Sequence, residues 1–254
     1  MTGRRTICEF DNRSMIDLHA HLLPSIDDGA DTIETALKMA RIAVDDGITH
    51  MACTPHVTPG VYDNTKPDIL KRIAALQQRL DEESINLWLL AGADIHVAPH
   101  LDERFRRGEI PTLNETRYFL FEPPHHVRLP GLVQFAGVLI RAGYYPIVTH
   151  PERLSWIEQH YQTVLDLKKA GCLIQVTAGA VTGRFGSRVK YWSERMLDEG
   201  IVDVIATDAH DPRRRPPIMS EARDAIAARH DDELALKVTE GMPLKILADK
   251  DLAA

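Results

Sequence analysis

Residues 15–29, which read Met-Ile-Asp-Leu-His-Ala-His-Leu-Leu-Pro-Ser-Ile-Asp-Asp-Gly, decide how the whole chain is interpreted. A short apolar run typical of a buried strand opens the stretch, and His19 and His21 follow at its carboxyl end. Side chains two apart on an extended chain point the same way, so both imidazoles can converge on one point. Pro24 ends the strand, and the turn that follows brings the Asp28 carboxylate back toward the two histidines. This donor set suits a divalent metal ion, although the stretch alone also fits a solvated strand end before a polar turn.

Length and composition indicate one globular domain. The chain has 254 residues, of which 44% are hydrophobic and 26% charged, values that are ordinary for a protein with a single core. Residues 1–14 have charges and no apolar centre, so we interpret them as an N-terminal extension rather than a secretion signal, and residues 15–254 as the domain. No apolar stretch is long enough to span a bilayer, which predicts no membrane insertion.

The cysteines and the net charge exclude several classes of protein. Cys8, Cys53 and Cys172 lie far apart and form no Cys-x-x-Cys pair, which argues against a zinc ribbon or a disulfide framework and favours the reducing cytoplasm. The formal net charge of −7 argues against a nucleic-acid-binding outer surface.

Seven apolar strands alternate with helical segments along the chain. We expect strands at 15–18, 48–53, 86–91, 116–121, 145–149, 172–177 and 201–206, and helices at 31–46, 64–83, 99–107, 132–142, 159–170, 186–199 and after 217. For the first helix, Asp31 is the expected cap. Such alternation predicts an α/β fold with a parallel sheet inside a layer of helices, closed into a seven-stranded barrel. An open doubly wound sheet is the alternative, but no glycine-rich phosphate loop follows the first strand.

Potential metal ligands follow six of these strands. They are His19, His21, Asp28, His56, Asp94, Glu122, His150, Asp208 and His210. In a barrel, the carboxyl ends of the strands meet at one face, where active sites are built. The alternative is that each residue is an isolated cap beside a loop, but side chains scattered at random would not follow the strands this regularly.

The kind and number of these side chains predict the metal. Imidazoles and carboxylates without thiolates suit Mn²⁺, Fe²⁺ or Zn²⁺, and nine donors suit two or three ions. Three divalent ions bring six positive charges and the four carboxylates return four negative ones, which leaves about two positive charges for a phosphate dianion. Such ions supply hydroxide at neutral pH.

Two arginines follow the fifth and the seventh of these strands closely enough to reach the same face. Arg153 lies three residues after His150, and Arg215 lies five residues after His210. A guanidinium can bind phosphate oxygens in a fork and offset charge in the transition state. For residues 213–215, an Arg-Arg-Arg run, a solvated basic turn is the alternative interpretation.

These motifs together resemble those of a known family. The pattern consists of His19-x-His21, Asp28-Gly29, Thr54-Pro55-His56, Glu122, His150-Pro151-Glu152-Arg153, Asp208-x-His210 and Arg215-Pro216-Pro217. It is similar to that of the polymerase and histidinol phosphatase (PHP) superfamily, and more closely to the bacterial metal-dependent protein-tyrosine phosphatases of capsule and exopolysaccharide operons. The resemblance runs from Met15 to about Pro217.

The resemblance implies a distorted (β/α)7 TIM-like barrel with a trinuclear centre, often activated by manganese. In that family, one ion would be held by His19, His21 and Asp208. A second would be held by Glu122 and His150, and a third by Asp28, His56 and His210. The family usually has a glutamate at the position of Asp94, bridging the first two ions; aspartate is one methylene shorter. His96 could compensate, although its position is typical of a surface histidine.

The function that follows is hydrolysis of phosphotyrosine on a protein, with the tyrosine-rich tail of a bacterial kinase of polysaccharide export as the expected partner. Arg153 and Arg215 would hold the phosphoryl oxygens, and His56 or Asp208 could protonate the leaving phenolate. Water should be the nucleophile, because Cys53 does not begin a Cys-x5-Arg loop. The alternatives are a small-molecule phosphatase of the histidinol-phosphate kind, a nuclease, which the acidic composition disfavours, and a non-catalytic metal-binding barrel.

Overall fold

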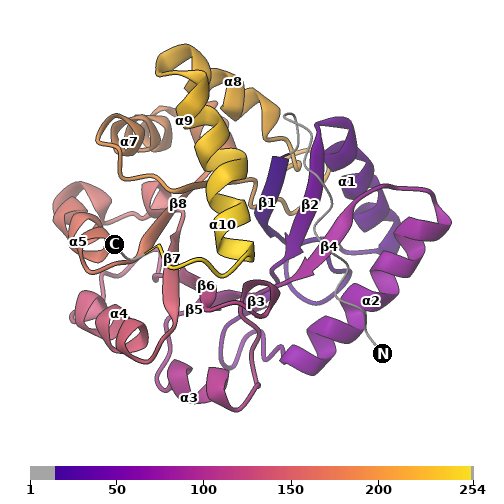
Figure 1. Cartoon of the computed structure of the whole chain (residues 1–254), viewed down its shortest axis with the longest axis horizontal. Helices are drawn as coiled ribbons and strands as arrows, with labels where there is room; N and C mark the ends of the chain where they lie inside the picture. Colours follow the sequence, from indigo (N-terminus) through magenta and orange to yellow (C-terminus); the bar gives the residue numbers. More distant parts are fainter. Residues whose placement is uncertain (1–14, 253–254) are drawn as a thin grey trace.

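The computed structural model describes residues 15–252, in which strands and helices alternate (Figure 1). The strands are β1 (Met15–Ala20), β2 (Ile48–Cys53), β3 (His56–Val57), β4 (Trp88–Ala91), β5 (Asp94–His96), β6 (Tyr118–Glu122), β7 (Tyr145–Thr149), β8 (Leu173–Thr177) and β9 (Val204–Ala206). The helices are α1 (Ile33–Asp45), α2 (Lys66–Glu82), α3 (Leu101–Arg106), α4 (Leu132–Arg141), α5 (Ile157–Lys169), α6 (Ala178–Val181), α7 (Ser187–Asp198), α8 (Ser220–Arg229), α9 (Asp232–Leu236) and α10 (Met242–Leu247). Shorter helical turns are η1 (Leu113–Glu115), η2 (Pro151–Arg153) and η3 (Lys237–Gly241). The predicted N-terminal extension, residues 1–14, lies outside the described residues.

All the strand ladders are parallel, as the alternation predicted. They form one sheet in the order β1-β2-β4 and a second in the order β3-β5-β6-β7-β8-β9. The prediction of one strand per unit was wrong in two places, because β2 continues as β3 after Thr54 and Pro55, and β4 continues as β5 after Gly92 and Ala93. Pro55 has no N–H to donate to a ladder, so the strand pairing is interrupted between β2 and β3.

The first and last strands meet through a short contact. Ala20 and Ala209 form a single parallel bridge, and the N–H of His21 donates to the carbonyl of Ala209 at 2.8 Å. Beneath them, the buried Asp17 carboxylate accepts hydrogen bonds from the backbone N–H and the hydroxyl of Thr207. Within residues 15–252, these few contacts join β1 to the chain after β9, and no continuous ladder does so. The strands therefore form a distorted, barrel-like arrangement and not a regular closed sheet.

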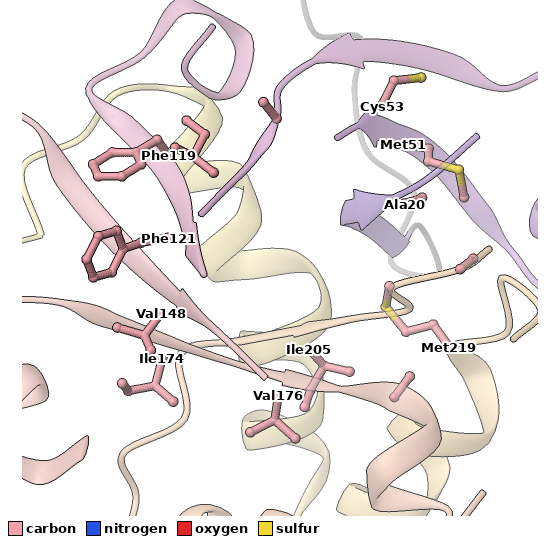
Figure 2. Packing of buried hydrophobic residues seen from close by; sticks show 14 of the residues in the cluster. Ala20, Met51, Cys53, Phe119, Phe121, Val148, Ile174, Val176, Ile205 and Met219 are labelled. Atoms are coloured by element: carbon pink, nitrogen blue, oxygen red, sulfur yellow. The ribbon is translucent and has the colours of Figure 1, made fainter. Parts of the chain in front are cut away.

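Two apolar cores occupy the two sides of the strands. In β6, Phe119 and Phe121 belong to the outer core between strands and helices, whereas Tyr118 and Leu120 belong to the inner one, as the two-residue period of a strand requires. Figure 2 shows Phe119 and Phe121 in the outer core together with residues of β7, β8 and β9.

The C-terminal helix closes the inner core at the amino ends of the strands. Met242 and Ile246 of α10 pack with Ile16 and Val204 in the inner cluster, and α10 crosses in front of the strands in Figure 1. The Tyr118 hydroxyl, at the start of β6, donates to the carbonyl of Lys250 at 2.6 Å. The carboxyl ends of the strands are therefore left for the functional site.

The helices agree with the predicted segments apart from their ends and apart from α6, a four-residue helix where a loop of small residues was expected. The expected cap of the first helix was wrong: Thr32, not Asp31, is the N-cap of α1, and its hydroxyl accepts from the N–H of Thr35 at 3.2 Å. Asp31 instead accepts from the hydroxyl of Thr35 at 2.6 Å, which supports the same turn from one residue earlier. Among residues 15–252, no helix has the length and apolar character needed to cross a membrane.

Gly29 lets the loop after β1 fold back against His21. The N–H of Ala30 donates to the carbonyl of His21 at 3.1 Å, which brings the two segments into contact. A Cβ atom at Gly29 would lie 2.2 Å from the carbonyl oxygen of His21 and 2.4 Å from its Cβ. A side chain at this position would therefore displace the loop that carries Asp28.

We expect Gly29→Ala to lower the free energy of unfolding by about 1–3 kcal/mol, the usual cost of overpacking a site whose neighbours are backbone atoms. Gly137→Ala, in α4, is the matched control, because a Cβ there meets the end of the flexible Arg141 side chain at 3.4 Å. Alanine is favoured over glycine in a helix, so the control should be neutral or stabilising. Urea denaturation of both variants measures this; equal stability of Gly29→Ala and the parent would contradict the close approach.

Candidate metal centre and active site

The carboxyl ends of the strands bring all the predicted ligands into one pit. Its mouth is a pocket of about 190 Å³ lined by Asp28, His56, Glu122, His125, His150, Arg153, Asp208, His210 and Arg215. His19, His21 and Asp94 lie fully buried beneath it. The predicted convergence of these side chains, including both arginines, is therefore seen in the structure.

The deepest cluster joins β1, β5 and the end of β9. The Nε2 atoms of His19 and His21 face each other at 3.2 Å. Asp208 Oδ1 lies 3.3 Å from His19 Nε2 and 3.5 Å from His21 Nε2. Asp94 Oδ2 lies 3.5 Å from His19 Nε2 on another side. Two imidazole nitrogens and two carboxylates thus surround one small volume.

A second cluster surrounds Glu122 at the end of β6. Its Oε2 atom lies 3.5 Å from His56 Nδ1, and its Oε1 atom lies 3.8 Å from His150 Nε2. Asp94 Oδ2 is 3.5 Å from His56 Nδ1 and 4.0 Å from His150 Nε2. Asp94 therefore lies between this cluster and the deepest one, in the position that a bridging carboxylate would occupy.

A third cluster lies nearest to solvent. Asp28 Oδ1 is 3.5 Å from His56 Nε2 and 3.5 Å from His210 Nε2. The ring of His21 lies close behind, with its centroid 3.9 Å from that of His210. This cluster is the most accessible, because the Asp28 side chain is 53% exposed.

Hydrogen bonds to the other ring nitrogen orient three of the histidines. His19 Nδ1 lies 2.9 Å from Gln175 Oε1, His21 Nδ1 lies 2.7 Å from Asp27 Oδ2, and His210 Nδ1 lies 3.0 Å from the Asp208 carbonyl oxygen. Each partner is an acceptor, so Nδ1 is the donor in each of these bonds and Nε2 points into the clusters. This is the arrangement that metal-binding histidines need.

Unsatisfied polar atoms also fit a cation. Both Asp94 oxygens are buried without a hydrogen-bond partner, and so are the Nδ1 atoms of His56 and His150. Buried polar atoms are normally hydrogen-bonded, so a group of unpaired acceptors requires an explanation. Divalent cations bound by imidazole and carboxylate supply one.

The pKa shifts reflect crowded charges. Burial opposes protonation of His21, but hydrogen bonds and charge interactions with Asp208 and Asp27 outweigh it and raise the His21 pKa to about 10. Burial and the nearby Asp94 charge raise the pKa of Glu122. Burial and the Arg153 charge lower the pKa of His125 to about 4. The shifts therefore differ in sign within one pit: the carboxylates beside His21 favour its protonated form, whereas burial and the Arg153 charge favour the neutral form of His125.

The two arginines share one partner. Arg153 and Arg215 both donate to Oδ2 of Asp208, whereas the Oδ1 atom of Asp208 faces the histidines. Their side chains are 20% and 22% exposed, so part of each guanidinium lines the open mouth. A phosphate that enters this mouth would contact both guanidinium groups.

Two predicted ligands occupy a strained backbone conformation. His150 has φ +35° directly after β7, and Asp208 has φ +51° after β9. Residues other than glycine seldom adopt this left-handed region, and such strain is concentrated at functional sites. At these two strand ends, the chain turns sharply so that both side chains enter the pit.

Sequence reasoning did not identify Gln175 or His125 as site residues. Asp27 was expected only as part of the turn that carries Asp28, and His96 was considered only as compensation for the shorter Asp94. Gln175 is a lone polar residue in an apolar strand, and Asp27 adjoins Asp28. His125 follows Glu122 in a Glu-Pro-Pro-His sequence. His96, expected at the surface, is partly buried with Nδ1 3.5 Å from Glu122 Oε2. An unexplained polar residue in a buried strand was the available signal for Gln175. The contact of His96 depends on the register of β5 with β6, and that of His125 on the folding of the loop after β6.

An apolar hollow adjoins the polar pit. Its volume is about 480 Å³, and its lining includes Val97, Leu129 and Phe135. Val97 directly follows His96, and Leu129 lies in the same loop as His125. The two loops that border Glu122 therefore also form this hollow.

Comparison with known proteins agrees with the site. A family model described as capsular polysaccharide synthesis, CpsB/CapC, matches residues 15–248. Tyrosine-protein phosphatase YwqE of Bacillus subtilis is 32% identical over 231 residues, 91% of each chain. Tyrosine-protein phosphatase CpsB of Streptococcus pneumoniae is 27% identical over 241 residues, 93% of this chain and 99% of CpsB.

Solved structures give the same result. A chain from the crystal structures of YwqE from Bacillus subtilis and CpsB from Streptococcus pneumoniae, described as unique metal-dependent tyrosine phosphatases, superposes with a TM-score of 0.90 at 31% identity, covering 93% of this chain and 96% of that one. The phosphotriesterase homology protein of Escherichia coli shares only the fold, with a TM-score of 0.60 at 8% identity. The resemblance drawn from the motifs is thereby confirmed, and the chain belongs to the CpsB/CapC family of capsular polysaccharide synthesis, whose relatives include metal-dependent tyrosine phosphatases.

Proposed function

We propose that this chain is a metal-dependent phosphatase that removes phosphate from tyrosine side chains of proteins. The observation that carries the proposal is the pit at the strand ends, where nine imidazole and carboxylate side chains converge beneath two arginines. The relatives named as tyrosine-protein phosphatases support the same reaction.

The proposed cofactor is two or three divalent ions, with Mn²⁺ first and Fe²⁺ or Zn²⁺ as alternatives. His19, His21 and Asp208 would hold one ion, and Glu122 and His150 another. Asp28, His56 and His210 would hold the third, with Asp94 between the first two. Bound ions of this kind supply a nucleophile at neutral pH and offset the charge on the transferred phosphoryl group.

The protein side chains provide binding and orientation. Arg153 and Arg215 donate N–H groups from one wall of the mouth, where they can hold phosphoryl oxygens and stabilise the charge that develops on them. Asp208 is the less suitable of the two proposed proton donors to the leaving phenolate. The pKa of Asp208 is held well below its usual range, since the His19 and Arg215 charges outweigh its burial. His56 lies at the rim with its side chain 16% exposed.

The proposed substrate is a phosphotyrosyl protein, with the tyrosine-rich tail of a bacterial kinase of capsule or exopolysaccharide synthesis as partner, and the cytoplasm is the proposed location of this chain. The apolar hollow beside the pit supports a peptide over a small phosphate ester, because it offers a surface to residues flanking the phosphotyrosine. The family description of capsular polysaccharide synthesis supports the partner.

A comparison of substrates tests the proposed reaction. With Mn²⁺ present, we expect kcat/KM for a phosphotyrosyl peptide to exceed that for histidinol phosphate at least tenfold, and single-stranded DNA to stay intact. Phosphate release measures the first two, and gel electrophoresis the third. Faster turnover of histidinol phosphate would favour the small-molecule phosphatase. If none of the substrates is turned over, the result would favour the non-catalytic metal-binding barrel.

Metal removal should abolish the activity. Dialysis against a chelator is expected to lower the phosphatase rate about 100-fold or more, and added Mn²⁺ should restore it, because the ions contribute several kcal/mol to the transition state. Alkylation of thiols should have little effect, since burial raises the pKa values of Cys53 and Cys172. Loss of activity on alkylation with the metal retained would argue for a thiol nucleophile.

Substitution of the arginines should lower turnover. We expect Arg215→Ala to reduce kcat/KM for a phosphotyrosyl peptide by about 10²–10³, the usual effect of removing a donor to developing charge. Arg213→Ala is the matched control, because Arg213 belongs to the same Arg-Arg-Arg run and its side chain is exposed. Equal rates for both variants would indicate that the run is only a solvated turn.

A further inference from the structure

We infer that His125 is an additional metal-binding residue, which with Glu122 and His150 forms a three-donor site at the rim of the pit. This inference rests on the proposed metal-dependent function and extends it to a side chain that neither the motifs nor the comparisons identify. Its basis is the position of the His125 ring relative to the two other side chains.

The distances suit a single ion. Glu122 Oε1 lies 3.7 Å from His125 Nε2 and 3.8 Å from His150 Nε2, and the three donor atoms all lie within 4.8 Å of one another. Two ligand atoms at about 2.0–2.2 Å from one ion are separated by roughly 3–4.4 Å. An ion can therefore bind all three after only small side-chain movements.

The loop that carries His125 is built to hold its ring there. The carbonyl of His125 accepts hydrogen bonds from both the N–H and the hydroxyl of Ser155, each at 3.0 Å. The Trp156 indole N–H donates to the carbonyl of Pro124 at 2.9 Å. These bonds attach the loop to the segment that follows His150, and the His125 ring lies with its centroid 5.0 Å from the His150 ring. The side chain is 28% exposed, which leaves the site open to substrate.

Neighbouring histidines do not share this arrangement. His126, the next residue, is exposed and belongs to none of the donor clusters found among residues 15–252. His96 approaches the opposite oxygen of Glu122, at 3.5 Å, and is also outside those clusters. His125 is thus distinguished by geometry rather than by residue type.

The third donor changes what the Glu122 and His150 pair can do. Glu122 and His150 share Asp94 with the deepest cluster, so without His125 they contribute only two donors of their own to a divalent ion, whereas a catalytic site typically has three protein ligands with one position open. With His125 included, the rim site has three protein donors and faces the mouth that Arg153 also lines. A phosphate bound there would contact both the ion and the guanidinium.

Metal binding by His125→Asn and His126→Asn tests this inference. Each purified variant is equilibrated with Mn²⁺ or Zn²⁺, the ions per chain are counted by elemental analysis, and the affinity is measured by competition with a chromophoric chelator. We expect His125→Asn to bind one ion at least tenfold more weakly, and His126→Asn to match the parent. His125→Glu, which returns a donor of similar reach, should recover part of the affinity, and circular dichroism checks that each variant folds.

Unchanged metal content and affinity in His125→Asn would overturn the inference. A loss of phosphatase rate with unchanged metal binding would also overturn it, since His125 would then act on the substrate. If instead the metal affinity falls but the parent hydrolyses no phosphotyrosyl peptide, the proposed function fails and the metal assignment stands.

Discussion

Carboxylates buried close together repel one another and lose their hydration, so they require positive charge nearby. Asp94 and Asp208 have almost no exposure, and Glu122 has little more. His19 and His21 offset part of their charge, as the raised pKa values of both imidazoles show, and the two arginines offset another part on Asp208. The two oxygens of Asp94 still have no hydrogen-bond partner. This feature distinguishes the pit from an ordinary buried polar cluster and suits the binding of cations.

The fold makes this crowding possible by covering the pit on every side but one. The inner core beneath it is closed by α10, and the outer core holds the strands in register around it. The left-handed backbone at His150 and Asp208 is energetically unfavourable for residues other than glycine. Position 29 does not tolerate a side chain, because a Cβ there would overlap His21. A chain selected only for stability would have no reason to keep them at these strand ends, so they indicate that side-chain placement, not packing, determines the local structure.

The sequence predicted those features that depend on local pattern. Apolar runs followed by His or Asp marked the strand ends, since parallel strands bring those ends to one face, and this placed both His19 and His210 at the pit. The break between β2 and β3 and the cap at Thr32 were missed because they depend on one residue's backbone geometry. Gln175 and His125 were missed for another reason. The partner of Gln175, His19, lies 156 residues away. His125 is only three residues from Glu122, but its second neighbour, His150, lies on another strand end, and its ring position depends on how the loop after β6 folds.

Asp208 connects the two parts of the site. Its Oδ1 atom faces the nitrogen atoms of His19 and His21, and its Oδ2 atom accepts from both arginines. A cation beside Oδ1 would withdraw negative charge from the whole carboxylate and weaken the hydrogen bonds that Oδ2 accepts from the two guanidinium groups. Their N–H groups would then be able to donate to an incoming phosphate. Without such a cation, Asp208 competes with phosphate for the same N–H groups. As a proposed metal ligand, Asp208 would therefore also set how strongly the arginines bind phosphate, so cation binding and phosphate recognition in this pit would be coupled.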